Sequence, residues 1–142
     1  MESRLSVRAD SAAMRQVDAF VATFVSEQGI AADDAARILI LLEELITNLT
    51  KYGYWDRAEP GMAEIALALN GSQLEIEFID DGCAFDPSAM PLPNLDQALE
   101  ERAIGGLGLH LLRSMTDEAR YERRNDTNVI RLSRIIISAK LP

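Results

Sequence analysis

The feature that most constrains the fold is a pair of alternating segments joined at Asn70-Gly71. The segments "MAEIALALN" (62–70) and "QLEIEFIDD" (73–81) alternate with a period of two residues, which is the pattern of strands. Asn-Gly between two such runs is a strong hairpin signal. The chain is therefore expected to pair these strands and to cover one face of the resulting sheet with other elements.

Helical periodicity precedes this hairpin. Asp10 or Ser11 can cap a helix that carries apolar residues at helical spacing and stops at Gly29. A second helix, with a dense apolar face, is predicted from about Ala32 to Tyr52. Before both helices, "RLSVR" (4–8) alternates as a strand does.

After the hairpin the regular pattern is lost in a proline-bearing connection over residues 82–105, which includes a short predicted helix at 94–102. So long a connection is usually functional or disordered. A helix at 107–115 follows, and then strands at 118–124 and 128–137 around an Asn/Asp turn. This element order predicts an α/β two-layer sandwich of mixed, mainly antiparallel β-sheet with helices on one face.

The composition limits the classes of function. With 142 residues, 48% of them hydrophobic, the chain fits a single domain over 1–142. A formal net charge of −9 argues against nucleic acid as the partner. The longest aliphatic run, Ile38 to Leu42, is too short to cross a membrane, and the first ten residues lack a signal core, so the cytoplasm is the expected location. Five arginines are spaced as outward strand positions: Arg120, Arg123, Arg124, Arg131 and Arg134.

Two of the three segments that can carry chemistry precede the connection. Glu44 and Asn48 lie four residues apart and share one helix face. Such a pair is ordinarily a solvated polar stripe, but a carboxylate beside an amide oxygen also offers a proton acceptor and a ligand for Mg²⁺. In "IDDGCAFDP", Asp80 and Asp81 reach a chain reversal at Gly82. Asp-Gly is ordinary turn chemistry, although an aspartate there can also accept a hydrogen bond from an exocyclic amine such as that of adenine.

The third segment is the glycine-rich stretch at 104–108, which leads into the helix predicted at 107–115. Exposed backbone N–H groups at a helix start attract anions such as phosphate. By itself the glycine pattern is weak evidence. No strand precedes it, so the dinucleotide fingerprint fails, and the P-loop pattern is absent.

Together, "EELITNLTKYGY", "DDGCAFDP" and "GGLGLHLLRSMTDEARY" resemble the N, G1 and G2 boxes of the GHKL ATPases, and most of all those of the bacterial anti-sigma-factor serine kinases and their stand-alone relatives. The resemblance covers nearly the whole chain, and the order and spacing of three motifs make it specific. It implies a Bergerat fold that binds ATP with Mg²⁺ between the helices and a lid at about 84–104.

The resemblance also implies roles for single residues. Glu44 would be the catalytic base, Asn48 the ligand of Mg²⁺ on the nucleotide phosphates, and Asp80 the carboxylate that binds adenine. The nucleotide pocket and phosphate loop would further include Gly82, Gly105, Gly106, Leu107 and Gly108. The sequence departs from the family pattern at Tyr52, where many such kinases have histidine, and at Ala84, where many members have a second glycine.

Two functions follow from the resemblance. The first is a protein serine/threonine kinase that phosphorylates a STAS-type anti-anti-sigma partner and thereby controls a sigma factor, with a homodimer formed through the first strand. The alternative is an ATP-binding protein-interaction module with little or no kinase activity. Glu44 separates the two, because a pure binding module needs no base.

Overall fold

The computed structural model describes residues 2–54, 58–84 and 114–136. The predicted helix at 94–102, almost all of the predicted lid at 84–104 and the predicted phosphate-loop residues Gly105, Gly106, Leu107 and Gly108 lie outside the described residues. The described elements are β1 (Glu2–Arg8), α1 (Ala13–Gln28), α2 (Ala32–Asn48), η1 (Leu49–Gly53), β2 (Met62–Asn70), β3 (Gln73–Asp80), β4 (Glu118–Arg124) and β5 (Thr127–Ile135).

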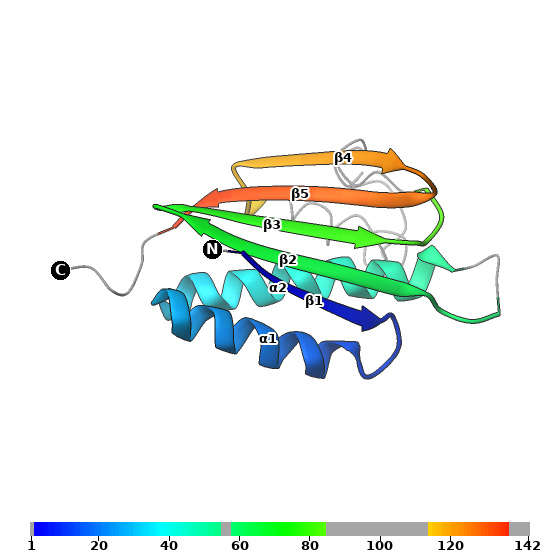
Figure 1. Cartoon of the computed structure of the whole chain (residues 1–142), viewed down its shortest axis with the longest axis horizontal. Coiled ribbons are helices and arrows are strands. Elements are labelled where there is room, and N and C mark those ends of the chain that lie inside the picture. The colour runs from blue at the N-terminus through cyan, green and yellow to red at the C-terminus, as the bar shows by residue number, and fades with distance from the viewer. Residues whose placement is uncertain (1, 55–57, 85–113, 137–142) are drawn as a thin grey trace, which may run out of the picture.

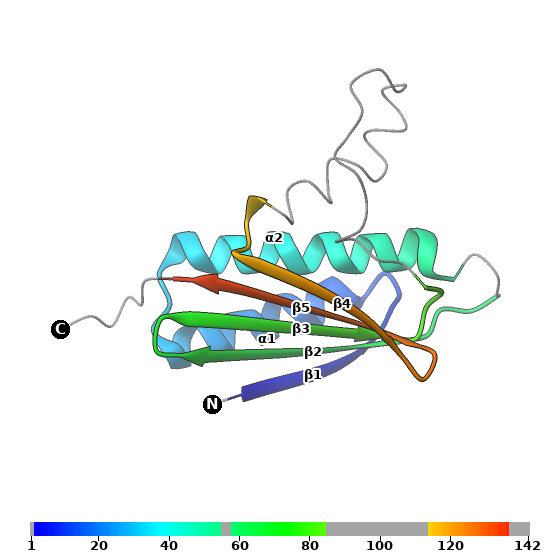
Figure 2. The ribbon, with the colours of Figure 1, turned by 90° about the horizontal axis from the view of Figure 1, so that it is seen from above.

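The five strands form one sheet in the order β1-β2-β3-β5-β4. Helices α1 and α2 lie together against one face of it, as Figures 1 and 2 show from two directions. The predicted two-layer α/β class is confirmed. Every neighbouring pair in the described sheet is antiparallel, so the parallel pairing that a mixed sheet would contain does not occur among these strands. The two hairpins produce antiparallel pairs directly.

Both predicted hairpins form. The β2–β3 loop has Gly71 at a φ of 63°, in the left-handed region that glycine enters without strain. In the β4–β5 turn, Asn125 and Asp126 have φ values of 50° and 65°, and these residue types tolerate that region. Two predicted bounds need small corrections: β3 ends at Asp80 rather than at 81, and β5 spans Thr127–Ile135 rather than 128–137.

The start of α1 differs from the prediction. The helix is preceded by Ala12, and no side chain caps it. The carboxylate of Asp10 instead accepts a hydrogen bond from the Ala12 backbone N–H at 2.9 Å, as Asp does in tight turns. Asp10 therefore shapes the reversal between β1 and α1. The predicted stop at Gly29 is confirmed, with a left-handed φ of 68°.

The second helix changes character before it ends. Its α-helical part stops at Asn48, and Leu49–Gly53 form a π-helical turn. The predicted single helix to Tyr52 is therefore two segments, and the turn directly follows the residue predicted to bind Mg²⁺. Wider helical turns of this kind are frequent at functional sites.

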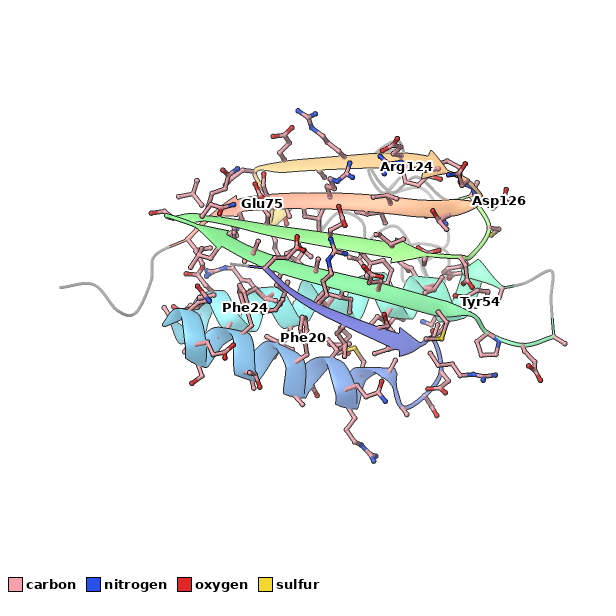
Figure 3. All side chains as sticks on the ribbon, in the orientation of Figure 1. Phe20, Phe24, Tyr54, Glu75, Arg124 and Asp126 are labelled. Carbon is pink, nitrogen blue, oxygen red and sulfur yellow. The ribbon has the colours of Figure 1, made fainter. Side chains whose placement is uncertain are left out.

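The core lies between the helices and the sheet. Phe24 of α1, Leu42 of α2 and Phe78 of β3 are each at most 1% exposed, and Figure 3 labels Phe24. Full burial of a side chain of this kind contributes about 1.5–3 kcal/mol. The opposite sheet face carries ion pairs, including Arg131 with Glu77 at 2.9 Å. No described helix combines the length and the apolar character that crossing a membrane would require.

Candidate functional site

The candidate site lies at one end of the sheet, where η1, the end of β3 and the start of β5 meet (Figure 1). There the described residues surround a cavity of about 30 Å³ between α2 and the sheet. This space accepts the edge of a ring or one small polar group rather than a whole nucleotide. The cavity is lined by Leu45, Asn48, Leu49, Tyr52, Gly53, Phe78, Asp80, Cys83, Asn128 and Ile130.

Asp80 is the buried carboxylate of this cavity, with 5% of its surface exposed. Its Oδ1 accepts two hydrogen bonds, from the Gly82 backbone N–H at 2.9 Å and from Asn128 Nδ2 at 2.9 Å. Among the described residues, Oδ2 has no hydrogen-bond donor. Burial raises the pKa of Asp80 and neighbouring Asp81 adds to this, whereas the two hydrogen bonds and the positive charge of Arg123 oppose the rise.

Asp81, the neighbouring carboxylate, is used for structure. Its Oδ1 accepts hydrogen bonds from the Tyr54 hydroxyl at 2.8 Å and from the Met62 backbone N–H at 3.1 Å. Tyr54 is labelled at this end of the molecule in Figure 3. Asp81 therefore joins the end of β3 to the start of β2, and it does not line the cavity. Of the two aspartates, the geometry selects Asp80 as the one available to a ligand.

Gly82 is required by packing at this turn. A Cβ at Gly82 would lie 2.9 Å from Leu49 Cδ1 and 3.0 Å from the Gly53 carbonyl oxygen. The Cys83 backbone N–H also donates to that carbonyl at 2.9 Å. The family resemblance implies that Gly82 belongs to the nucleotide pocket. The structure adds that Gly82 lets the β3 turn contact η1, which holds the two sides of the cavity together.

Asn48 and Glu44, the two α2 residues predicted to act together, differ in their position relative to the cavity. Asn48 lines the cavity and is 8% exposed, and no side-chain hydrogen bond joins it to a described residue. Glu44 is half-buried one turn earlier, about 6 Å along the helix axis, and does not line the cavity. Because its side chain lines the cavity, Asn48 is placed to bind a ligand or a ligand-bound ion.

Sequence reasoning missed Asn128, Tyr121 and Arg123. Asn128 is 2% exposed and lies opposite Asp80 in the strand register. The available signal is the alternation of β5, which puts Asn128 on the buried face together with Ile130.

The prediction that all five C-terminal arginines point outward is wrong for two of them. Arg123 donates to the Gly82 carbonyl at 2.8 Å, and Arg134 donates to the Met115 carbonyl at 2.7 Å. Arg123 alternates with Arg124 along β4, so it shares the inner face with Tyr121. Figure 3 labels Arg124, which pairs with Glu122.

The donor set fits an aminopurine and a nucleotide-bound cation. A free carboxylate oxygen within apolar walls suits a planar ring that donates from an amino group, and the oxygen of Asn48 suits Mg²⁺. Among the described residues, no group of three or more His, Cys, Asp or Glu side chains could hold a metal ion. A cation here would therefore depend on ligands from the nucleotide.

Comparison with known proteins agrees with this geometry. A family model described as a histidine kinase-like ATPase domain matches residues 7–134. Serine-protein kinase RsbW of Staphylococcus epidermidis is 27% identical over 108 residues, which cover 73% of this chain and 68% of the relative. Serine/threonine-protein kinase BtrW of Bordetella bronchiseptica is 24% identical over 96 residues, with 68% and 67% covered.

The fold is also found among solved structures. The RsbU and RsbW domains of a Mycobacterium tuberculosis protein superpose with a TM-score of 0.67 at 20% identity, over 96% of this chain. This chain spans 32% of that solved chain. The likeness therefore concerns the fold of one part of the larger protein.

Proposed function

We propose that this chain, which belongs to the histidine kinase-like ATPase domain family, binds ATP between α2 and the sheet and is a protein serine/threonine kinase. The proposed substrate is a serine or threonine of a STAS-type anti-anti-sigma protein, whose phosphorylation controls a sigma factor. One observation carries the proposal. Among the described residues, the buried carboxylate of Asp80 has one oxygen without a hydrogen-bond donor, and it lines the same cavity as the side chain of Asn48. Kinship with RsbW and BtrW, both named protein kinases, supports the class of reaction.

The proposed binding mode follows from the donors and acceptors. The adenine amino group donates to Asp80 Oδ2, while Phe78 and Ile130 supply apolar contact to the ring. Asn48 would hold Mg²⁺ on the phosphates, together with oxygens of the nucleotide. When bound, Mg²⁺ neutralises charge on the transferring phosphoryl group.

The proposed transfer assigns the proton to Glu44. As the hydroxyl oxygen of the partner bonds to the γ-phosphorus, the bond from that phosphorus to the β,γ-bridging oxygen breaks and ADP leaves. Glu44 takes the hydroxyl proton. Its position one turn from Asn48 is consistent with a base that acts near the phosphates and away from the adenine end.

We also propose a homodimer through the free edge of β1. Antiparallel pairing of β1 with its symmetry mate, centred on Leu5, would place Glu2 opposite Arg8 of the partner subunit. These opposite charges would meet twice by symmetry. Light scattering tests the proposal: a mass of 15.7 kDa at every concentration would reject it.

The binding-module alternative is supported by one observation. Glu44 does not line the described cavity, so the described geometry accounts for binding more fully than for catalysis. A module would bind ATP and a protein partner with little or no phosphate transfer.

The test is to incubate the protein with labelled ATP and STAS proteins encoded by the same genome, and to look for phosphoserine or phosphothreonine. Transfer to one of them supports the kinase. ATP binding without transfer to any of them favours the module, and absence of ATP binding rejects both.

A further inference from the structure

Asn128 lies beside the proposed adenine contact, and protein groups use its full hydrogen-bonding capacity. Its Nδ2 donates to Asp80 Oδ1 at 2.9 Å and to the Cys83 carbonyl at 2.8 Å. Its Oδ1 accepts from the Tyr121 hydroxyl at 2.6 Å and from Arg123 Nη1 at 3.1 Å. Nothing on this side chain is left for a ligand, so its role must be exerted through its neighbours.

These partners fix the orientation of the amide. A guanidinium only donates, so the atom that Arg123 meets must be the amide oxygen. A carboxylate and a backbone carbonyl accept, so the atom that faces Asp80 and Cys83 must be the amide nitrogen. Rotation of the amide by half a turn would set donor against donor and acceptor against acceptor, within a side chain that is 2% exposed.

We propose that Asn128, held by Arg123, is a positioning residue that fixes the carboxylate of Asp80 and thereby makes the site select 6-aminopurines over 6-oxopurines. This inference rests on the proposed nucleotide function. Asp80 cannot rotate without losing both hydrogen bonds to Oδ1, so Oδ2 stays turned to the ligand as an acceptor. An acceptor pairs with the amino group of adenine and repels the oxygen that hypoxanthine carries at the same ring position.

Arg123 also contacts Gly82, the second residue that donates a hydrogen bond to Asp80. Its Nη1 also donates to the Gly82 carbonyl at 2.8 Å, and the Gly82 N–H is the other donor to Asp80 Oδ1. The arginine therefore stabilises both groups that hold the carboxylate. Selectivity for the base is set in part by the β4–β5 hairpin, although the hydrogen bonds of the Asn128 side chain and of Arg123 Nη1 all go to protein groups.

The experiment compares the dissociation constants of ADP and inosine diphosphate, with Mg²⁺, by calorimetry. Asn128→Asp keeps the size of the side chain and replaces its donor by an acceptor, and Arg123→Gln removes the charge. Both variants should bind ADP about tenfold more weakly and lose a similar factor in the preference for ADP. Arg123→Lys keeps the positive charge and should recover part of that preference. The matched control, Arg124→Gln, lies on the other face of β4 and should behave as the parent.

The outcomes separate the inference from the function on which it rests. If the parent binds ADP and the folded variants keep its selectivity, the positioning role is wrong and the proposed function stands. If the parent binds neither nucleotide, the proposed function fails, and hydrogen exchange of the Asn128 side-chain NH₂ in the ligand-free protein tests the positioning. Slow exchange that Arg123→Gln accelerates supports it, whereas equal exchange in the two proteins overturns it.

Thermal melting checks the fold of each variant. Should Asn128→Asp not fold, Tyr121→Phe provides the test, because it removes a single hydroxyl from the network. Its expected loss of selectivity is smaller than that of Arg123→Gln, and no loss in either variant would overturn the proposal.

Discussion

Replacing Asp80 by Asn tests the nucleotide site with one exchanged atom. The Gly82 N–H and Asn128 Nδ2 both donate to Oδ1 of Asp80, so an Asn at position 80 must keep its oxygen there. Its NH₂ then takes the place of Oδ2 and faces the ligand. The site changes from an acceptor to a donor while the shape of the side chain is preserved.

The expected magnitude follows from the lost contact. A hydrogen bond to a charged group contributes about 1.5–3 kcal/mol, so Asp80→Asn should weaken ADP about 10- to 150-fold. Inosine diphosphate presents an oxygen that the new NH₂ can donate to, so it should lose less affinity or gain some. The preference between the two nucleotides should narrow or reverse.

The same substitution should lower the affinity for ADP without lowering the stability of the fold. Because burial raises the pKa of Asp80, the folded state holds this proton more tightly than the unfolded state does. Stability therefore falls as pH rises from the ordinary aspartate value of about 3.9 through the raised folded value. Asp80→Asn removes the buried charge, so its Tm should equal or exceed that of the parent at neutral pH. The difference should shrink below about pH 4, where the carboxyl is protonated in both states.

The assay is calorimetry with both nucleotides, together with melting curves across pH. Asp81→Asn is the matched control, because Asp81 is engaged by Tyr54 and Met62 and should leave the nucleotide preference unchanged. Unchanged ADP affinity in Asp80→Asn would refute the assignment of Asp80. A shifted preference in Asp81→Asn would assign the contact to Asp81 instead.

Three further predictions concern the α2 residues and the β3 turn. Glu44→Gln should keep nucleotide affinity and lower phosphate transfer about 10²–10⁴-fold. Transfer at the parental rate in a filter assay would exclude Glu44 as the base, and it would favour Glu43 or proton transfer by the substrate. Asn48→Ala should lower both ADP affinity and transfer because it removes a Mg²⁺ ligand, and an unchanged Mg²⁺ dependence of ADP binding would reject that role. Gly82→Ala would force the new Cβ against Leu49 and the Gly53 carbonyl. It should lower the free energy of unfolding in urea by about 1–3 kcal/mol. A loss under about 0.5 kcal/mol would show that the turn adjusts freely.

The sequence predicts the fold well where local chemistry decides it. The alternating strands, the left-handed residues of both hairpins and the stop at Gly29 depend on side-chain period and turn geometry, which are properties of short segments. The cap of α1 and the π-helical turn after Asn48 are less predictable. Asp10 is suited to either a cap or a turn, and the contact of η1 with the β3 turn is made between segments far apart in the chain.

In the candidate site, too, some features follow from short segments of sequence and others arise only from contacts between distant segments. The alternation of β3 brings Asp80 and Asp81 to the strand end, and the family resemblance singles out Asp80. The structure adds that Asp81 is engaged by Tyr54 and Met62. Asn128 and Arg123 come from a hairpin more than 40 residues away, and only the β3–β5 register places Asn128 opposite Asp80. The alternation of β5 puts Asn128 on the buried face, but a single sequence does not show which β3 residue it pairs with, so the network around Asp80 could not have been predicted.

The central claim is that an adenine nucleotide binds between α2 and the sheet, against Asp80. The most direct test is a titration of the ¹⁵N-labelled protein with ADP and Mg²⁺, followed through the Gly82 and Cys83 backbone amides and the side-chain NH₂ groups of Asn48 and Asn128. We predict saturable shifts at these four positions, with the hairpin at Gly71 unaffected. Absence of shifts at millimolar ADP, or shifts confined to the Gly71 end of the sheet, would contradict the claim.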